Sequence, residues 1–388
     1  MRAIDTNVAV IGGGVVGCAV LHALTRRGVQ ATLLEAESGL ALGASGTNSG
    51  ILHTGFDSTP GELETRLILR AGELREGLLG ELSVDAWRCG ARMAPQGEQE
   101  RAAVAQLAER ARANGVDAEL GGDGALHVPG ESVTDPVAFT CALADAARLG
   151  GASVLLGARV RALAHEGSRF AVELEGPDGV QVLSTRAVVN CAGLFADEIA
   201  RMAGEAGFSI YPRKGEFLVF QMPGGDPLQQ ILLPVPSSVG KGVLVFPTVD
   251  RQLIAGPSAR EREDKYDWSV EPDAAEIILA RAARVYPALQ SARRLGAYAG
   301  LRPAGRGVNY LIEPSRVLPG LVHVAAIRST GLSAAPAIGE HVLGLLERGG
   351  AIELGPERPL PAPARSHAAA WWTRAARHHG APGALAAR

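Results

Sequence analysis

Residues 8–17 read VAVIGGGVVG, and this stretch decides the fold. A short apolar run of the kind found in buried parallel strands is followed at once by glycines in the GxGxxG spacing. Gly12 permits the tight turn, Gly14 lets a pyrophosphate approach the backbone, and Gly17 lets a helix over residues 15–27 pack closely on the strand. The N–H groups at the start of that helix then face the phosphates.

A second predicted strand, residues 31–34, ends in Glu35, about 20 residues after the glycine turn. A carboxylate at this place can accept hydrogen bonds from adenosine ribose hydroxyls, and it repels a 2′-phosphate, which disfavours NADP. A glycine turn can also serve packing alone. The strand, helix and acid in the right order favour a bound dinucleotide.

Composition and charge are those of a globular protein. The chain has 388 residues, enough for two domains, and it is 47% hydrophobic and 20% charged. A net charge of -3 gives no signature for binding nucleic acid. We expect a cytoplasmic protein, because no apolar run approaches the roughly 20 residues of a membrane span and no leader-like segment precedes the first strand. The cysteines form no CxxC pair, so we expect no metal site.

The later sequence predicts that the chain leaves the dinucleotide-binding domain, forms a second domain and then returns to the first. The expected helices are 135–149, 273–286 and 334–346, and the expected strands are 152–156, 187–193, 216–221, 242–247, 252–256 and 321–326. The predicted fold class is α/β, α+β overall, with a Rossmann-type domain beside a mixed or antiparallel-sheet substrate domain. We assign 1–85, 146–210 and 300–350 to the first domain, 86–145 and 211–299 to the second, and 351–388 to a Pro/Ala-rich tail.

Five further motifs carry a family resemblance. They are GASGTNSGILHTG at 43–55, VVNCAGLFAD at 188–197, PRKGE at 212–216, AGLRP at 299–303 and IRSTGLSAAP at 327–336. In this order they resemble the flavin-dependent D-amino-acid oxidase superfamily, within it the branch of L-2-hydroxyglutarate and glycerol-3-phosphate dehydrogenases. The resemblance implies FAD, and we expect it to be non-covalent, because no flavin-attachment signature is evident.

The cofactor residues follow from the glycine turn and from these motifs. The loop 43–50 is rich in small residues and hydroxyls, which suits contact with a pyrophosphate and a flat flavin ring, although such residues also make plain surface turns. Gly331 opens a helix whose N-terminus could face the flavin, or it could be an ordinary helix start. The expected cofactor residues are Gly12, Gly14, Gly17, Glu35, Ala44, Ser45, Asn48, Ser49, Val160, Ala192, Gly193, Gly331, Leu332 and Ser333.

Two residues are candidates for the chemistry. His53 resembles the histidine of an NSGxxHxG motif, and a neutral imidazole there could take a hydroxyl proton while a hydride leaves for the flavin; a structural histidine is the alternative. Arg302, in AGLRP, resembles the superfamily arginine that clamps the substrate anion; the alternative is a surface arginine. Lys214 and Lys241 are weaker candidates for anion contacts. The negative charge of Asp57, close to the expected anion site, is unfavourable for binding an anion.

The predicted activity is hydride transfer from the CH–OH of a small anionic substrate, a 2-hydroxy acid such as L-2-hydroxyglutarate or a glycerol-3-phosphate-like compound, to flavin N5. An amine or amino-acid oxidase and a flavin-binding electron-relay subunit stay open as alternatives, and an NAD-dependent dehydrogenase is disfavoured. The electron acceptor could be oxygen, a quinone or another protein. The C-terminal region lacks clustered cysteines, which makes an iron–sulfur centre unlikely on sequence grounds.

The tail is predicted to be a linker or a weakly ordered extension. Trp371 and Trp372, followed by Arg374 and Arg377, could instead form a membrane-surface or partner-docking segment, or a terminal helix that packs on its own domain. If the tail is a linker, a chain truncated before Pro361 should keep its flavin.

Overall fold

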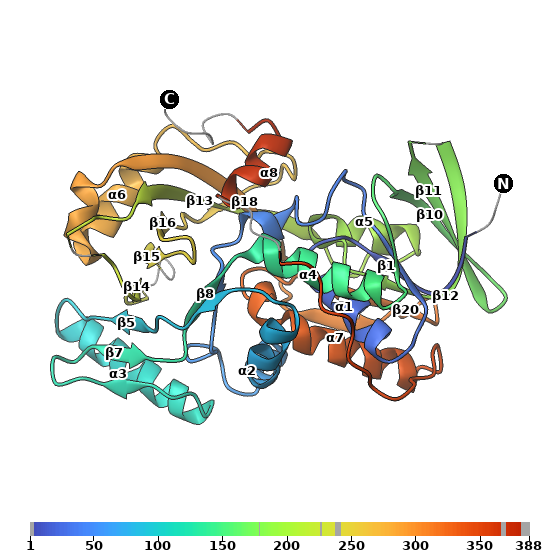
Figure 1. The fold of residues 1–388 in the computed structure, drawn as a ribbon, viewed down its shortest axis with the longest axis horizontal. Helices are drawn as coiled ribbons and strands as arrows, with labels where there is room; N and C mark the ends of the chain where they lie inside the picture. The colour runs from blue at the N-terminus through green and yellow to red at the C-terminus, as the bar shows by residue number, and fades with distance from the viewer. Residues whose placement is uncertain (1–3, 178, 226, 237–241, 366–369, 382–388) are drawn as a thin grey trace.

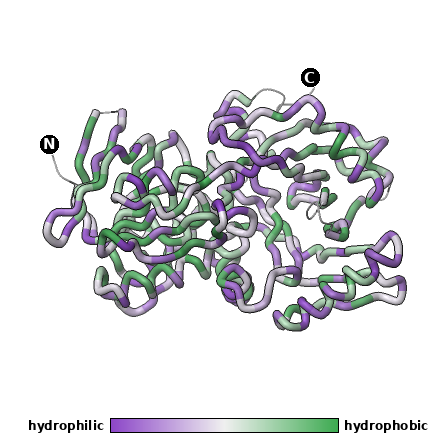
Figure 2. Tube along the Cα trace, turned by 180° about the vertical axis from the view of Figure 1, so that it is seen from behind, coloured by the Kyte–Doolittle hydropathy of each residue, from purple (hydrophilic) through white to green (hydrophobic). Residues whose placement is uncertain are grey.

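The structure is a computed structural model that describes residues 4–177, 179–225, 227–236, 242–365 and 370–381. Two units lie side by side, each built on its own sheet (Figure 1). Hydrophobic stretches gather inside the sheet and helix layers, and hydrophilic residues follow the loops (Figure 2). The α/β class and the two-unit arrangement predicted from the sequence are confirmed.

The first sheet has the order β10 (Arg159–Glu166), β11 (Arg169–Gly176), β12 (Gly179–Asn190), β1 (Ile4–Ile11), β2 (Ala31–Leu34) and β9 (Ser153–Leu155), with β20 (Leu321–Ala325) and β19 (Leu311–Pro314) beyond β12. Strands β9, β2, β1, β12 and β20 run parallel. Along β1, Val8 and Val10 pack with α1, whereas Ala9 and Ile11 pack against α5 and the β10–β11 hairpin. Burial on both faces explains why this strand reads as a continuous apolar run.

Helices cover both faces of this sheet. On one face α1 (Val15–Arg26) lies between α4 (Pro136–Leu149) and α7 (Gly331–Arg348), and α2 (Leu63–Glu81) packs on α7. The other face carries α5 (Ala196–Met202). The chain leaves the first sheet after β2 and returns to it at β9, and α4 belongs to the segment between them. The start of α4 is fixed by the Asp135 carboxylate, which accepts hydrogen bonds from the N–H groups of Val137 and Ala138.

The second sheet has the order β17 (Arg260–Glu261), β13 (Ile210–Gln221), β16 (Gln252–Gly256), β15 (Leu244–Pro247), β14 (Ile231–Leu233), β5 (Ala91–Met93), β7 (Leu126–Val128) and β6 (Glu119–Leu120), with β18 (Arg294–Gly305) on β13. All of these pairs are antiparallel except β14 with β5. Helices α6 (Ala274–Val285) and α3 (Glu98–Ala113) pack on it. A small sheet of β3 (Ile51–Leu52), β8 (Ser132–Thr134) and β4 (Ala86–Trp87) joins the two units.

The prediction of a weakly ordered tail is wrong for the described residues. The backbone N–H of Gly355 donates to the carbonyl of Arg27, and a final helix, α8 (Trp372–His378), returns to the core. Trp371 and Trp372 are 1% and 4% exposed and contact Tyr298. Burial of two indole rings supplies the free energy that orders this segment.

None of the helices in the described ranges combines the length and the apolarity needed to cross a membrane.

Candidate active site

One cavity of roughly 1050 Å³ lies between the two units. On one side it is lined by the carboxyl ends of β1, β2, β12 and β20, where open α/β sheets bind their ligands. The loop 43–49 and the start of α7 close this side, and β13 and β18 of the second sheet form the opposite wall. The cavity therefore has the volume and the lining to hold a dinucleotide along the first sheet and a small substrate beside the second.

The glycine turn has no room for side chains. Gly12 has a φ of +110°, and a Cβ there would lie 2.4 Å from the Cys191 carbonyl oxygen. A Cβ on Gly17 would lie 2.0 Å from the Gly12 oxygen, so this glycine serves the close packing of α1 on β1. The Ser45 hydroxyl accepts a hydrogen bond from the N–H of Val15 at 2.9 Å, which ties the loop after residue 43 to the start of α1.

The Glu35 carboxylate is fixed beside this turn. One oxygen accepts from the N–H of Gly13 at 2.5 Å, and the other accepts from the N–H of Glu37 at 2.7 Å. Burial raises the pKa of the Glu35 carboxyl, and these backbone hydrogen bonds act in the opposite direction. The carboxylate is thus held at the end of β2, facing the cavity, as the dinucleotide prediction requires.

His53 lies just after β3 and lines the cavity, with 26% of its side chain exposed. Its backbone N–H donates to the Ser333 hydroxyl at 2.8 Å, and its carbonyl accepts from Arg75 at 3.0 Å. Its ring Nδ1 lies 2.9 Å from a carboxylate oxygen of Glu131, which is fully buried. Glu131 could not be predicted from the sequence, because a carboxylate 78 residues away can be paired with a histidine only through the tertiary fold.

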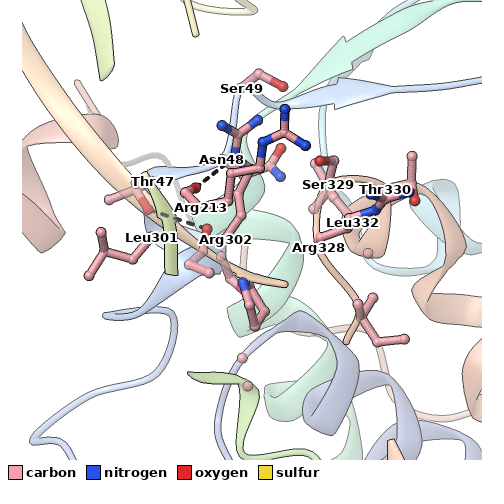
Figure 3. A pocket seen from close by; sticks show the side chains of 18 of the residues that line it. Thr47, Asn48, Ser49, Arg213, Leu301, Arg302, Arg328, Ser329, Thr330 and Leu332 are labelled. Atoms are coloured by element: carbon pink, nitrogen blue, oxygen red, sulfur yellow. Dashed lines mark hydrogen bonds between the residues drawn. The ribbon is translucent and has the colours of Figure 1, made fainter. Parts of the chain in front are cut away.

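Three arginines line the cavity, two from the second sheet and one from the loop before α7 (Figure 3). Arg302 on β18 is paired in register with Arg213 on β13, and Arg328 lies in the loop before α7. Arg302 is held by carbonyls: Nε donates to Arg213 at 3.0 Å, and Nη2 donates to Ser258 at 3.2 Å and to Lys214 at 3.3 Å. Burial lowers the pKa of Arg302 to about 10, and the charges of Arg213 and Arg328 act in the same direction.

The arginine cluster has no anionic partner in the part of the chain that the structure describes. No carboxylate of that part forms an ion pair with Arg213, Arg302 or Arg328, whereas Arg260 and Arg262 nearby are both paired. Three cations that line one cavity repel one another, and an anionic ligand relieves that repulsion.

The expectation that Lys214 contacts a substrate anion is wrong. Its side chain is fully buried and does not line the cavity, and its ammonium lies 2.9 Å from Asp267, 3.0 Å from Ser269 and 3.5 Å from Glu271. Lys214 follows Arg213 on the same strand, and adjacent side chains point to opposite faces of a sheet. Lys241 lies outside the described residues.

Most of the other predicted site residues meet in this one cavity. Those that line it are Gly12, Gly14, Glu35, Ala44, Ser45, Asn48, Ser49, His53, Val160, Ala192, Gly193, Arg302, Gly331 and Leu332. Gly17 and Ser333 do not line it: Gly17 packs on the strand, and Ser333 supports the backbone of His53.

The C-terminal segment completes one end of the cavity. His379 lines it; the Nε2 atom of its ring lies 2.7 Å from the Leu42 carbonyl, and the ring stacks on Trp268 with centroids 4.2 Å apart. His378 Nε2 lies 2.8 Å from the Glu37 carboxylate. Helix α8 packs against residues 44–47 of the cofactor loop. The end of the chain thus braces the loop expected to hold the flavin.

A chain ending at Arg365 is therefore expected to bind FAD about tenfold more weakly or worse, which corresponds to a loss of roughly 1.4 kcal/mol. Fluorescence titration of the deflavinated protein with FAD measures this. His379→Ala keeps the tryptophans in place and should weaken binding by a smaller factor. A chain ending at Ala381 keeps every contact described above and serves as the control. Equal affinities for all four proteins would mean that the tail has no part in holding the cofactor.

Comparison with known proteins identifies relatives over almost the whole chain. The profile of a family described as FAD dependent oxidoreductase matches residues 7–345. A glycerol 3-phosphate dehydrogenase of Caloramator mitchellensis is 30% identical over 364 residues, which are 88% of this chain and 74% of that protein. An L-2-hydroxyglutarate dehydrogenase of Escherichia coli O17:K52:H18 is 27% identical over 295 residues, 70% of this chain and 69% of that protein.

A solved structure supports the same assignment. The dithionite-reduced L-alpha-glycerophosphate oxidase of Mycoplasma pneumoniae, with FAD bound, superimposes with a TM-score of 0.85 at 25% sequence identity, covering 92% of this chain and 97% of that one. The similarity extends across both units and the cavity between them.

Proposed function

The chain belongs to the family of FAD-dependent oxidoreductases, and from this premise we propose that it oxidises the CH–OH group of a small phosphorylated polyol of the glycerol 3-phosphate class. The observation that carries this proposal is the cluster of Arg213, Arg302 and Arg328, which line the cavity without carboxylate partners in the described part of the chain. A phosphate has a charge of about −1.5 to −2 and three terminal oxygens, so it matches three guanidinium groups better than one carboxylate does.

The residues present fit FAD. The turn at Gly12 admits only glycine, because a Cβ there would meet the Cys191 carbonyl oxygen, and the Glu35 carboxylate lines the cavity beside this turn, where it could accept hydrogen bonds from ribose hydroxyls. Gly331 and Leu332 at the start of α7 bring a positive helix end to the same cavity. When bound, FAD supplies the two-electron acceptor for the hydride that leaves the carbinol carbon.

The chain itself supplies binding and proton transfer. Arg302 and Arg213 hold the anion from the wall opposite the cofactor side of the cavity, and Arg328 contributes a third positive charge from the loop before α7. His53 takes the proton of the substrate hydroxyl at Nε2, because Nδ1 is occupied by Glu131. Phe217, Phe246 and Leu233 line the same space with apolar surface, which excludes water from the reacting carbon.

L-2-Hydroxyglutarate, with two carboxylates, is the second substrate of this class, and it needs the same base and at least one arginine. Amine donors need the base less, because an amine that binds deprotonated has no hydroxyl proton to lose. The His53 and Glu131 pair therefore favours CH–OH over CH–NH oxidation.

Anaerobic stopped-flow reduction of the bound flavin tests this proposal independently of the electron acceptor. We expect glycerol 3-phosphate to reduce the flavin fastest, L-2-hydroxyglutarate more slowly, and glycerol, which lacks the phosphate, at least about a hundredfold less efficiently in rate constant over dissociation constant. Fast reduction by amino acids, with none by the hydroxy compounds, would assign the chain to the amine-oxidising members instead.

A further inference from the structure

A buried carboxylate with every oxygen engaged lies behind the candidate base. Glu131 is 0% exposed, and its two oxygens have different partners. Oε2 lies 2.9 Å from Nδ1 of His53, and Oε1 accepts from the backbone N–H of Thr54 at 2.7 Å and from the Thr54 hydroxyl at 2.8 Å. Because the Thr54 contacts fix one oxygen, the other is held at a constant place beside the imidazole.

A buried cation supports the same arrangement from α2. Arg75 is 8% exposed, and its Nη2 donates to the carbonyls of His53 at 3.0 Å and Ser333 at 3.4 Å. Burial lowers the pKa of Arg75 to about 10, while the nearby charge of Glu131 acts in the opposite direction. A carboxylate taken fully out of water is costly unless charge and hydrogen bonds compensate it. Arg75 and Thr54 provide that compensation, so the Glu131 carboxylate can stay buried beside Nδ1 of His53.

The contact determines which imidazole nitrogen carries the proton. A carboxylate only accepts hydrogen bonds, so Nδ1 of His53 must be the donor. In the neutral ring Nε2 then has a free lone pair, and among the described residues none forms a hydrogen bond with it. His53 lines the cavity, so this lone pair is available to a bound substrate.

The other histidine and carboxylate pairs of the described chain lack this combination. His323 pairs with Glu205 at 3.3 Å, but it is 1% exposed, lies away from the cavity lining, and has its other ring nitrogen 3.0 Å from Asn190. His378 pairs with a carboxylate that is exposed. Among the histidines that the structure describes, only His53 has a fully buried carboxylate on one side and the cavity on the other.

We infer that Glu131 is the positioning residue of the reaction: it fixes the tautomer and the orientation of His53, so that Nε2 accepts the substrate hydroxyl proton, and it stabilises the imidazolium that results. The inference rests on the proposed oxidation of a CH–OH group. The proton taken from the substrate hydroxyl then resides on Nε2 of His53 as the hydride leaves the substrate carbon.

Glu131→Gln keeps the shape of the side chain but replaces a carboxylate oxygen, which accepts hydrogen bonds, by an NH₂ group, which donates them. The fixed N–H of Thr54 holds the amide oxygen, so the amide NH₂ faces Nδ1 of His53 and requires that nitrogen to accept. Nε2 then carries the hydrogen and cannot act as a base. We expect the rate constant of anaerobic flavin reduction to fall about tenfold to a hundredfold, with the substrate dissociation constant and the flavin content unchanged.

A double-mutant cycle separates this role from a structural one. In a His53→Ala background, Glu131→Gln should change the reduction rate less than about twofold, because the group through which it acts is absent. Glu205→Gln, the same change at the other buried histidine pair, is the control and should leave reduction unaffected. An equal loss in both backgrounds, or less than about a threefold loss in the wild type, would overturn the inference.

If Glu131→Gln does not retain flavin, Thr54→Val replaces it in the cycle. That variant removes the 2.8 Å bond that helps to fix the carboxylate, and it should slow reduction a few-fold in the wild type and not at all beside His53→Ala. An equal effect in both backgrounds again rejects the role of Glu131. A failure of the proposed function looks different, because then no hydroxy substrate reduces the wild-type flavin.

Discussion

Arg302→Ala is expected to lower kcat/KM for glycerol 3-phosphate by roughly 30-fold to several thousand-fold, while the protein keeps its flavin. The loss corresponds to about 2–5 kcal/mol of transition-state binding, the usual cost when a buried anion loses its hydrogen-bonded partner. Steady-state kinetics with a dye acceptor and the absorbance of the bound flavin measure the two quantities.

The size of this effect follows from the setting of Arg302. Nε and Nη2 are held by three backbone carbonyls, so the guanidinium enters the cavity in one orientation and little entropy is lost when an anion binds. No hydrogen bond with a described residue holds the guanidinium of Arg213 or Arg328, and Arg328 is also exposed to water that screens its charge. Their alanine variants should therefore cost less than Arg302→Ala.

Arg306→Ala provides the matched control. Arg306 follows the same strand, but it pairs with Glu263, rests over the ring of Tyr211 and does not line the cavity. It should leave kcat/KM unchanged. A loss below about threefold for Arg302→Ala, or an equal loss for both variants, would exclude Arg302 as the anion clamp.

Local sequence was sufficient for the cofactor half of the site. In residues 8–35 the strand, turn, helix and acid are neighbours in the chain, and each has a steric or electrostatic role that few residue types can fill. The structure accordingly has β1, α1 and β2 where they were predicted, with Glu35 beside the turn. His53 and Arg302 were found because each lies within a family motif.

The missed residues are those whose role depends on which face of an element they occupy. In PRKGE the sequence favoured Lys214, yet Arg213 lines the cavity, and only the packing of β13 decides which of two adjacent residues points inward. Glu131 is near His53 through the pairing of β3 with β8. Helix α2, which supplies Arg75, was not predicted, because its charged residues surround most of it and leave only a weak apolar stripe.

The linker prediction for the tail was wrong for a related reason, whereas the alternative of a terminal helix that packs on its own domain agrees with α8. Proline and alanine near residue 361 resemble a linker, but two tryptophans bury so much apolar surface that they outweigh the weak local preference. Composition indicates only the conformation that a segment prefers in isolation. Here the contacts of both tryptophans with Tyr298 of the second sheet determine that the segment is ordered.

His53→Ala is expected to slow flavin reduction by glycerol 3-phosphate on the order of a hundredfold or more, with the substrate dissociation constant nearly unchanged. The ring receives the hydroxyl proton as the hydride leaves, so its removal affects the reduction step, whereas the arginine cluster that holds the anion stays in place. The hyperbolic dependence of the anaerobic reduction rate on substrate concentration yields the two constants separately.

His165→Ala is the control for this substitution, because His165 on β10 packs against Phe170 on β11 with ring centroids 4.6 Å apart, away from the cavity lining. A His53 variant that weakens substrate binding but reduces flavin at the wild-type rate would make His53 a binding group. The two variants then distinguish the roles assigned to the two walls: Arg302→Ala raises the dissociation constant, and His53→Ala lowers the rate constant. If the walls act independently, the free-energy losses of the double variant should add, because the two side chains contact different parts of the substrate.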